Sequence, residues 1–163
     1  MEPVTVRAAR PQDYDAIRDV TLEVYIGAGL AGPDYRATLA DVEDRARHTD
    51  LLVAVSGDRV VGSVAFAWHA TAYAEITAGP DEAAFRMLAV SPEARGRGTG
   101  RALVQACVDR ARAAGVRRIV ISSETTMVAA HRLYVSMGFQ RDPVRDWSPH
   151  PGVDLICYVL RLI

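Results

Sequence analysis

The chain has 163 residues, of which 50% are hydrophobic and 24% charged, and its formal net charge is −1. This length suits one domain with its own core, so we expect residues 1–163 to form a single domain. The near-zero charge excludes a global field for polyanions, and no apolar run approaches the roughly 20 residues that span a bilayer. We therefore expect neither a nucleic-acid partner nor a membrane partner.

The cysteines and the N-terminal residues indicate the cellular compartment in which we expect the protein. Cys107 and Cys157 are isolated and have no Cys or His at metal-ligand spacing, so we expect no metal site. Residues 1–4 lack the basic and apolar regions of a secretory signal. Reduced, buried thiols without such a signal predict a cytoplasmic protein.

Periodicity and turn residues predict the elements of the first half. In chain order these are a strand over 4–7, a helix from residue 11 to about residue 25, a mobile glycine-rich connection over 27–33, a second helix over 37–47, a hairpin of strands 51–55 and 59–68, and an irregular segment over 69–80.

The second half continues the alternation of strands and helices. The pattern predicts a strand over 84–90, a helix over 99–114 ended by Gly115, a buried strand over 118–123, a helix over 127–137 ended by Gly138, a strand over 139–141, a loop over 142–152 and a last strand over 155–160. Without internal repeats or linkers, these elements indicate one α/β domain.

The most informative segment is the glycine loop that follows the strand over 84–90. It reads Arg95-Gly96-Arg97-Gly98-Thr99-Gly100-Arg101 and opens a helix. Glycines expose backbone N–H groups to an anion, the helix adds its positive dipole end, and three arginines favour several phosphate groups. A P-loop would need Gly-Lys-Ser/Thr, and a dinucleotide fingerprint would need Gly-x-Gly-x-x-Gly. A nicotinamide-dependent enzyme is still an alternative, since Glu124 ends the next strand, where an acidic residue could bind the ribose of the cofactor.

Two motifs give a family resemblance. Residues 95–100 after an apolar strand resemble the acyl-CoA pyrophosphate loop of the GCN5-related N-acetyltransferase (GNAT) superfamily. Residues 130–139, Ala-His-Arg-Leu-Tyr-Val-Ser-Met-Gly-Phe, are similar to its Leu-Tyr-x-x-x-Gly-Phe signature. The resemblance covers the whole chain. It implies a mixed, mostly antiparallel twisted sheet of about seven strands with four helices, splayed between strands 4 and 5.

The resemblance also implies an activity: acetyl-CoA, without a metal, would donate an acetyl group to a primary amine of a small molecule or peptide by direct attack. Tyr134 matches the family's general acid. The implied cofactor-binding residues are Leu88, Ala89 and Val90 on the strand and Arg95, Gly96, Arg97, Gly98, Thr99, Gly100 and Arg101 in the loop. A homodimer is common in the family, and the apolar C-terminal strand favours one.

The chain departs from the family pattern at two positions. Ala84 stands where many relatives carry a glutamate, so the general base is open among Glu82, Glu75, His69, Glu124 and water. Met127 replaces an asparagine that is common near the start of the Tyr134 helix. These departures support the alternative of a non-catalytic acyl-CoA-binding sensor.

The acceptor is suggested only by aromatic side chains. The resemblance implies that three segments form the acceptor side, and tyrosines and tryptophans recur in them: 25–35, 68–73 and 147–150. Exposed aromatics there indicate an apolar or aromatic acceptor, or a dimer contact.

Overall fold

The structure is a computed structural model that describes residues 2–30 and 32–163. Met1 of the N-terminal segment and Ala31 of the expected glycine-rich connection lie outside the described residues. Within the described part of the chain, no helix is long and apolar enough to cross a membrane.

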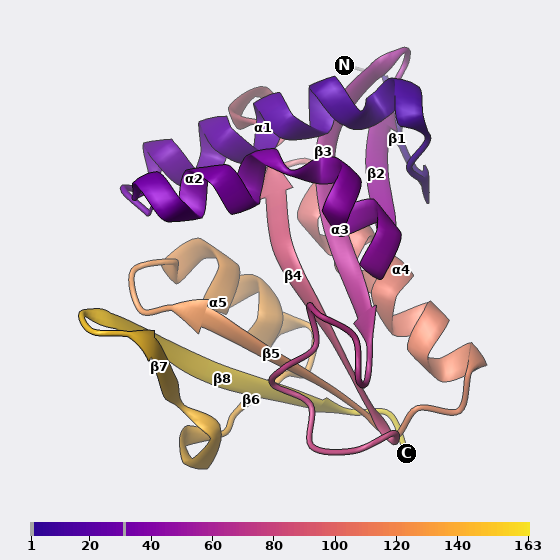
Figure 1. The fold of residues 1–163 in the computed structure, drawn as a ribbon. Helices are drawn as coiled ribbons and strands as arrows, with labels where there is room; N and C mark the ends of the chain where they lie inside the picture. The colour runs from indigo at the N-terminus through magenta and orange to yellow at the C-terminus, as the bar shows by residue number, and fades with distance from the viewer. Residues whose placement is uncertain (1, 31) are drawn as a thin grey trace.

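The elements alternate much as the periodicity predicts (Figure 1). They are β1 (Val4–Ala8), α1 (Tyr14–Gly27), α2 (Pro33–Ala40), α3 (Val42–His48), β2 (Asp50–Ser56), β3 (Arg59–Trp68), β4 (Glu82–Val90), α4 (Thr99–Ala113), β5 (Arg118–Glu124), α5 (Val128–Ser136), β6 (Gln140–Arg141), β7 (Trp147–His150) and β8 (Val153–Arg161). Short 3₁₀ turns lie at Pro11–Asp13, Pro92–Ala94 and Pro143–Arg145.

All strands join one mixed sheet in the order β1-β2-β3-β4-β5-β8-β6, with β7 paired to β8. Each neighbouring pair is antiparallel except β4 and β5, which run parallel. That parallel pair is joined only where Glu82 faces Arg118 and Ala83 faces Ile119. Figure 1 shows β4 and β5 diverging from this point near the C-terminus, which confirms the expected splay.

Two expectations for the elements were wrong, and each has a local cause. The helix expected over 37–47 is two helices, because Asp41 leaves the helical region (φ −83°, ψ 70°) and its side chain caps α3 through the N–H of Asp44. The loop expected over 142–152 contains β7, which pairs with the start of β8. The sheet therefore has eight strands and five α-helices flank it, against about seven and four expected.

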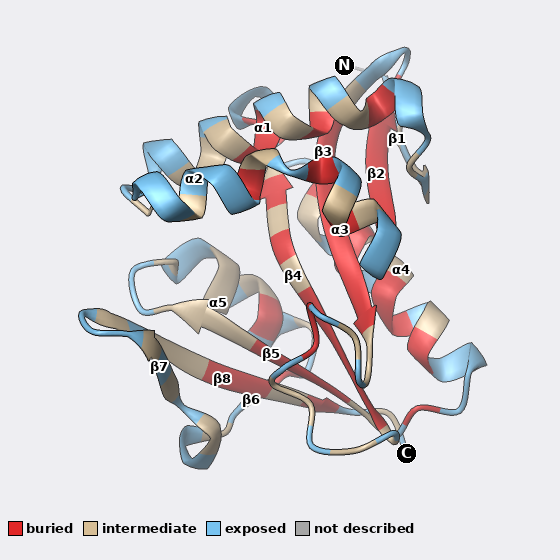
Figure 2. Cartoon of the chain, in the orientation of Figure 1, coloured by how far each residue is buried: buried red, intermediate tan, exposed pale blue. Residues whose placement is uncertain are grey.

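The core lies on both faces of the sheet. Helices α4 and α5 cover one face around Phe66, Phe85 and Leu103, which belong to the largest apolar cluster. Helices α1 to α3 cover the other face, where two smaller clusters form around Ile17 and Leu39. Strands β2 and β3 are buried along most of their length, as Figure 2 shows. With helices on both faces, the gap between β4 and β5 is the break in an otherwise continuous sheet.

Candidate active site

The first element of the site is the edge of β4 that β5 leaves open. From Ala84 to Val90 this strand has no register partner on the β5 side, whereas β3 pairs with its other edge. Backbone N–H and C=O groups at a strand edge can pair with an extended ligand that carries amides. Leu88 and Val90 are half-buried here, and Ala89 is buried opposite Ser63 of β3.

A β-bulge interrupts β4 at the middle of this open edge. The register to β3 shifts between Ala65, which faces Arg86, and Ser63, which faces Ala89. Met87 takes up the extra residue with φ +56°, a left-handed conformation that is rare for a residue with a side chain. Such strain persists where the surroundings impose it, and it re-aims the neighbouring peptide groups.

The glycine loop joins this edge to the start of α4. Gly96 (φ +73°) and Gly98 (φ +78°) are left-handed, and an added Cβ on either would meet no atom within 4 Å. The backbone of both glycines is therefore open to a ligand. Gly98 is the N-cap of α4 and supplies no side-chain cap, so the first-turn N–H groups stay available to an anion.

Two other loop residues serve packing. A Cβ on Gly100 would lie 3.2 Å from Leu133 of α5, so this glycine lets α4 and α5 approach. The Thr99 side chain is buried and donates to the carbonyl of Ala94, 3.1 Å away, which leaves only its backbone for a ligand.

A fourth glycine, Gly62 on β3, supports the loop from beneath. A Cβ on Gly62 would lie 3.0 Å from the carbonyl oxygen of Ala89 and 3.1 Å from Leu103. Gly62 thus sets how closely the first turn of α4 seats on the sheet. Sequence reasoning missed it, because one glycine in a strand pattern does not say what approaches it.

The loop arginines differ in what they contact. Arg95 and Arg97 are exposed and make no hydrogen bond or ion pair with any described residue. Arg101 donates to the hydroxyl of Ser136 on α5 at 2.7 Å. Two of the three expected phosphate-binding cations are therefore free to turn toward a ligand.

Tyr134 lies on α5 beneath the open edge and is 6% exposed. Its ring packs against Phe85, Phe139 and Tyr158 at centroid distances of 5.8, 5.7 and 5.9 Å. Its hydroxyl donates to no described residue. Burial raises the pKa of this phenol, with smaller contributions from Cys107 and Tyr158, so it keeps its proton at neutral pH.

Two tyrosines face the gap from the other layer. Tyr25 of α1 and Tyr35 of α2 form an edge-to-face pair at 6.1 Å and pack with Met87 of the bulge. Burial raises the pKa of Tyr25, and the phenols of Tyr35 and Tyr134 raise it further. Tyr134 belongs to α5, on the opposite face of the sheet from α1 and α2.

The other expected acceptor aromatics are engaged elsewhere. Trp68 packs on Phe66 and donates to Asp50 at 3.2 Å. Tyr73 is buried and donates to Asp44 at 2.7 Å, and burial raises the pKa of Tyr73 to about 12. The expectation of exposed aromatics was wrong for these two, and Trp147 on β7 is half-buried.

Three of the four candidate bases have partners. Glu82 is 1% exposed and accepts from two arginines. Glu75 pairs with Arg86 at 2.6 Å. A ring nitrogen of His69 lies 2.7 Å from the Thr77 hydroxyl. Each of the three groups is thus already engaged by a neighbouring side chain.

Glu124 is the exception among them. It ends β5 beyond the last pairing with β4, is half-buried, and its carboxylate has no hydrogen-bond partner among the described residues. Burial raises the pKa of Glu124, and nearby Asp154 adds to the rise.

One titratable group beside the gap was not foreseen. His131 of α5 lies 3.1 Å from the hydroxyl of Ser123, next to Glu124, and burial lowers its pKa. Its position three residues before Tyr134 was the available sign, since that spacing puts both residues on one helix face. The described residues include no group of three or more His, Cys, Asp or Glu that could hold a metal ion.

Comparison with known proteins agrees with this geometry. The model of the acetyltransferase (GNAT) family matches residues 14–139, more than half of the chain. The chain belongs to the GNAT family.

Individual relatives extend the comparison. Rat N-acetyltransferase 8F1 is 35% identical over 121 residues, which are 70% of this chain and 53% of that protein. The chain spans about half the length of the curated relatives it matches. A GCN5-related N-acetyltransferase from Kribbella flavida has a TM-score of 0.71 at 27% identity, covering 98% of both chains. A Salmonella typhimurium structure containing its cofactor acetyl-CoA has a TM-score of 0.71 at 22% identity, covering 98% of this chain and 94% of that one.

Proposed function

We propose that the protein is an acetyl-CoA-dependent N-acetyltransferase. The observation that carries the proposal is that three features follow one another along the chain. They are the open, bulged edge of β4, the two left-handed glycines of the loop, and the uncapped N-terminus of α4. An acyl-CoA has the matching shape, with two amides in its arm and a pyrophosphate at its far end.

The chain's own groups fit each part of that co-substrate, which supplies the activated thioester when bound. Backbone groups of Leu88, Ala89 and Val90 on the open edge pair with the amides, as an added strand would. Around Gly98 the loop N–H groups bind the pyrophosphate. Arg95 and Arg97 add charge, since neither has a described partner.

The reaction needs one proton removed and one supplied. The acceptor nitrogen forms a bond to the acetyl carbon, the carbon–sulfur bond breaks, and CoA leaves as a thiolate. Glu124 accepts the proton that the amine must lose, because its carboxylate is unpaired and its raised pKa makes it a better base. Tyr134 donates its proton to the sulfur as the carbon–sulfur bond breaks, because burial keeps its phenol protonated and its hydroxyl is uncommitted, and the phenolate takes a proton back from solvent when the products leave.

The acceptor enters from the layer of α1 and α2. Tyr25 and Tyr35 form its wall, so we propose a primary amine carried on an apolar or aromatic small molecule or peptide terminus. The buried thiols Cys107 and Cys157 agree with a cytoplasmic setting. A homodimer through the C-terminal strand stays a prediction, supported by Ile163, which is 83% exposed.

The test separates an enzyme from an acyl-CoA-binding sensor. The protein is incubated with acetyl-CoA and a panel of aromatic and aliphatic amines, and free thiol is measured. We expect amine-dependent thiol release, and Tyr134→Phe should lower turnover about 10²-fold with little change in acetyl-CoA affinity. Binding of acetyl-CoA without thiol release for any amine would favour the sensor. No CoA binding at all would contradict both, and tight NAD binding would then favour the nicotinamide-dependent enzyme.

A further inference from the structure

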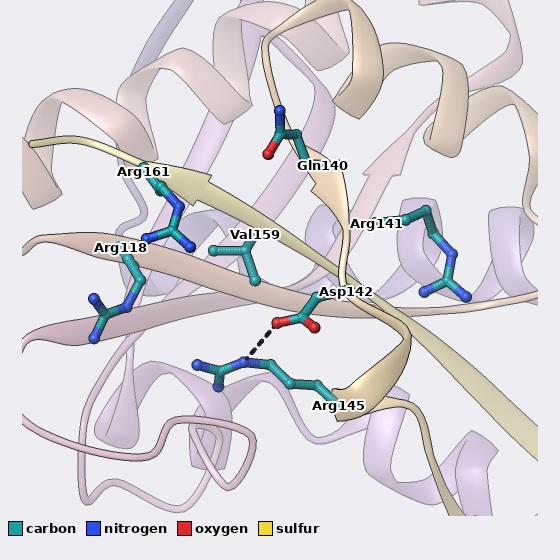
Figure 3. Close-up of a pocket in the computed structure, with 7 residues that line it drawn as sticks. All are labelled: Arg118, Gln140, Arg141, Asp142, Arg145, Val159 and Arg161. Atoms are coloured by element: carbon teal, nitrogen blue, oxygen red, sulfur yellow. Dashed lines mark hydrogen bonds and ion pairs between the residues drawn. The ribbon is translucent and has the colours of Figure 1, made fainter.

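A second concave site lies at the vertex of the splay, away from the open part of the gap. A cavity of about 340 Å³ is present where β5 begins and β8 ends (Figure 3). Its lining includes four arginines, Arg118, Arg141, Arg145 and Arg161, and only one acidic residue, Asp142. In Figure 3, Arg118, Arg145 and Arg161 project to one side of the cavity, and Arg141 extends away from them.

Two of these arginines lie directly opposite each other on neighbouring strands of the sheet. Arg118 is the register partner of Arg161 in the antiparallel pair of β5 and β8. Like charges at directly opposite positions destabilise a sheet. Arg118 is balanced by Asp81 at 2.8 Å and Glu82 at 2.9 Å. Arg161 is exposed and has no hydrogen bond or ion pair with any described residue, so its guanidinium is open to a ligand from solvent.

The surrounding carboxylates are already committed. Glu82 is held by Arg118 and Arg145, and Asp142 by Arg145. Asp146 is held by Arg141 at 2.8 Å. None of them pairs with Arg161, so an added anion would give this guanidinium a charged partner.

The arginines also keep unused donors. A guanidinium has five N–H groups. Arg118 uses two of them, on Asp81 and Glu82, and Arg145 uses three, on Glu82 and Asp142. Arg161 uses none with the described residues. Planar guanidinium groups with free N–H pairs match the oxygens of phosphate and carboxylate groups.

We propose that this cavity is a binding site for a small molecule that carries an oxyanion, a phosphate or a carboxylate group, with Arg161 as its principal ligand. Free N–H groups of Arg118 and Arg145 complete the site. The same two arginines clamp Glu82, where β4 and β5 are joined, so an occupied cavity braces the vertex from which the gap opens.

The test follows the arginine side chains by NMR, which suits a chain of 17.7 kDa. The Nε–H signals are recorded during separate titrations with inorganic phosphate and with acetate at constant ionic strength. We expect the signals of Arg118, Arg145 and Arg161 to shift together and to fit a single, shared Kd on the order of millimolar. In Arg161→Gln, the remaining two signals should report a Kd at least about tenfold weaker.

The control is Arg112→Gln, which removes the same charge from an exposed position on α4 and should leave the Kd unchanged. Anion binding at the glycine loop appears separately, in the backbone signals of Gly96 and Gly98. A response to phosphate alone or to acetate alone supports the site and identifies the group. The proposal is overturned if the three signals do not move up to about 50 mM of either anion, or if Arg161→Gln retains the parent's Kd.

Discussion

Glu82→Gln tests the physical account of the splay most directly. The carboxylate of Glu82 is 1% exposed and accepts four hydrogen bonds: two from Arg145, at 2.6 and 3.1 Å, one from Arg118 at 2.9 Å, and one from the N–H of Ala78 at 2.8 Å. Burial alone would raise the pKa of Glu82, but these donors outweigh it and hold the pKa below its usual range. The substitution keeps the size of the side chain and removes its charge.

The expected loss of stability is large for one atom exchanged. Breaking a buried ion pair costs about 3–5 kcal/mol when an uncompensated charge is left behind. Arg145 and Arg118 keep 24% and 28% exposed side chains, so water partly compensates them and we expect the low end, about 3 kcal/mol. For a chain of this size that corresponds to a fall in Tm of roughly 6–12 °C.

Thermal unfolding followed by circular dichroism measures the effect. Glu93→Gln is the matched control, because Glu93 pairs with Arg59 through side chains that are 46% and 68% exposed, and such a pair contributes at most about 1 kcal/mol. The pH dependence has a defined sign. A carboxyl with a lowered folded pKa stabilises the protein above its unfolded pKa, so the gap between parent and Glu82→Gln should be full at pH 7 and shrink below about pH 4.3. If the two variants melt within roughly 2 °C of each other at pH 7, the reasoning fails.

Three further predictions concern the active site. Gly98→Val should weaken acetyl-CoA binding at least about tenfold in calorimetry. The control Gly115→Val, at a similar φ of +74° and in equally open space, should carry the same backbone strain and leave the affinity unchanged. Equal acetyl-CoA affinities in the two variants would contradict the assignment of the loop to the pyrophosphate. Gly62→Ala should destabilise the fold by about 1–3 kcal/mol, because its Cβ would press on the Ala89 carbonyl, and an unchanged Tm would contradict that contact. Glu124→Gln should lower kcat/KM about 10²-fold and abolish the rise in rate as pH increases through the Glu124 pKa, a limb that would persist if water were the base.

Local chemistry explains why part of the site could be predicted from the sequence. The glycine loop and the helix it opens depend on residues within one turn or one helix, so local spacing predicts them. The glycine stops of two helices hold for the same reason, since Gly115 and Gly138 adopt the left-handed conformation that ends a helix. The role of Tyr134 is implied by the family resemblance and stays a prediction.

Long-range pairing explains what the sequence could not provide. Glu82 was a candidate base because it lies close to the β4 motif in sequence, yet its partners stand 36 and 63 residues away. Choosing Glu124 instead depends on which carboxylates are already paired, and only the folded chain decides that. Likewise, the opposition of Arg118 and Arg161 follows from the register of β5 and β8, which no local pattern specifies.

Different interactions therefore determine the two ends of the gap between β4 and β5. At the vertex, Glu82 and its two arginines fasten β4 to β5 through charge, next to the two register pairs that join the strands. Beyond Ala83 nothing of that kind continues: β5 stays paired with β8 through Glu124, and β4 stays paired with β3 around the bulge at Met87. Each strand is thus held by its outer neighbour while their facing edges stay unpaired. A sheet edge buried inside a domain is costly unless its N–H and C=O groups find partners, and that requirement supports our proposal that a ligand with its own amides binds in this gap.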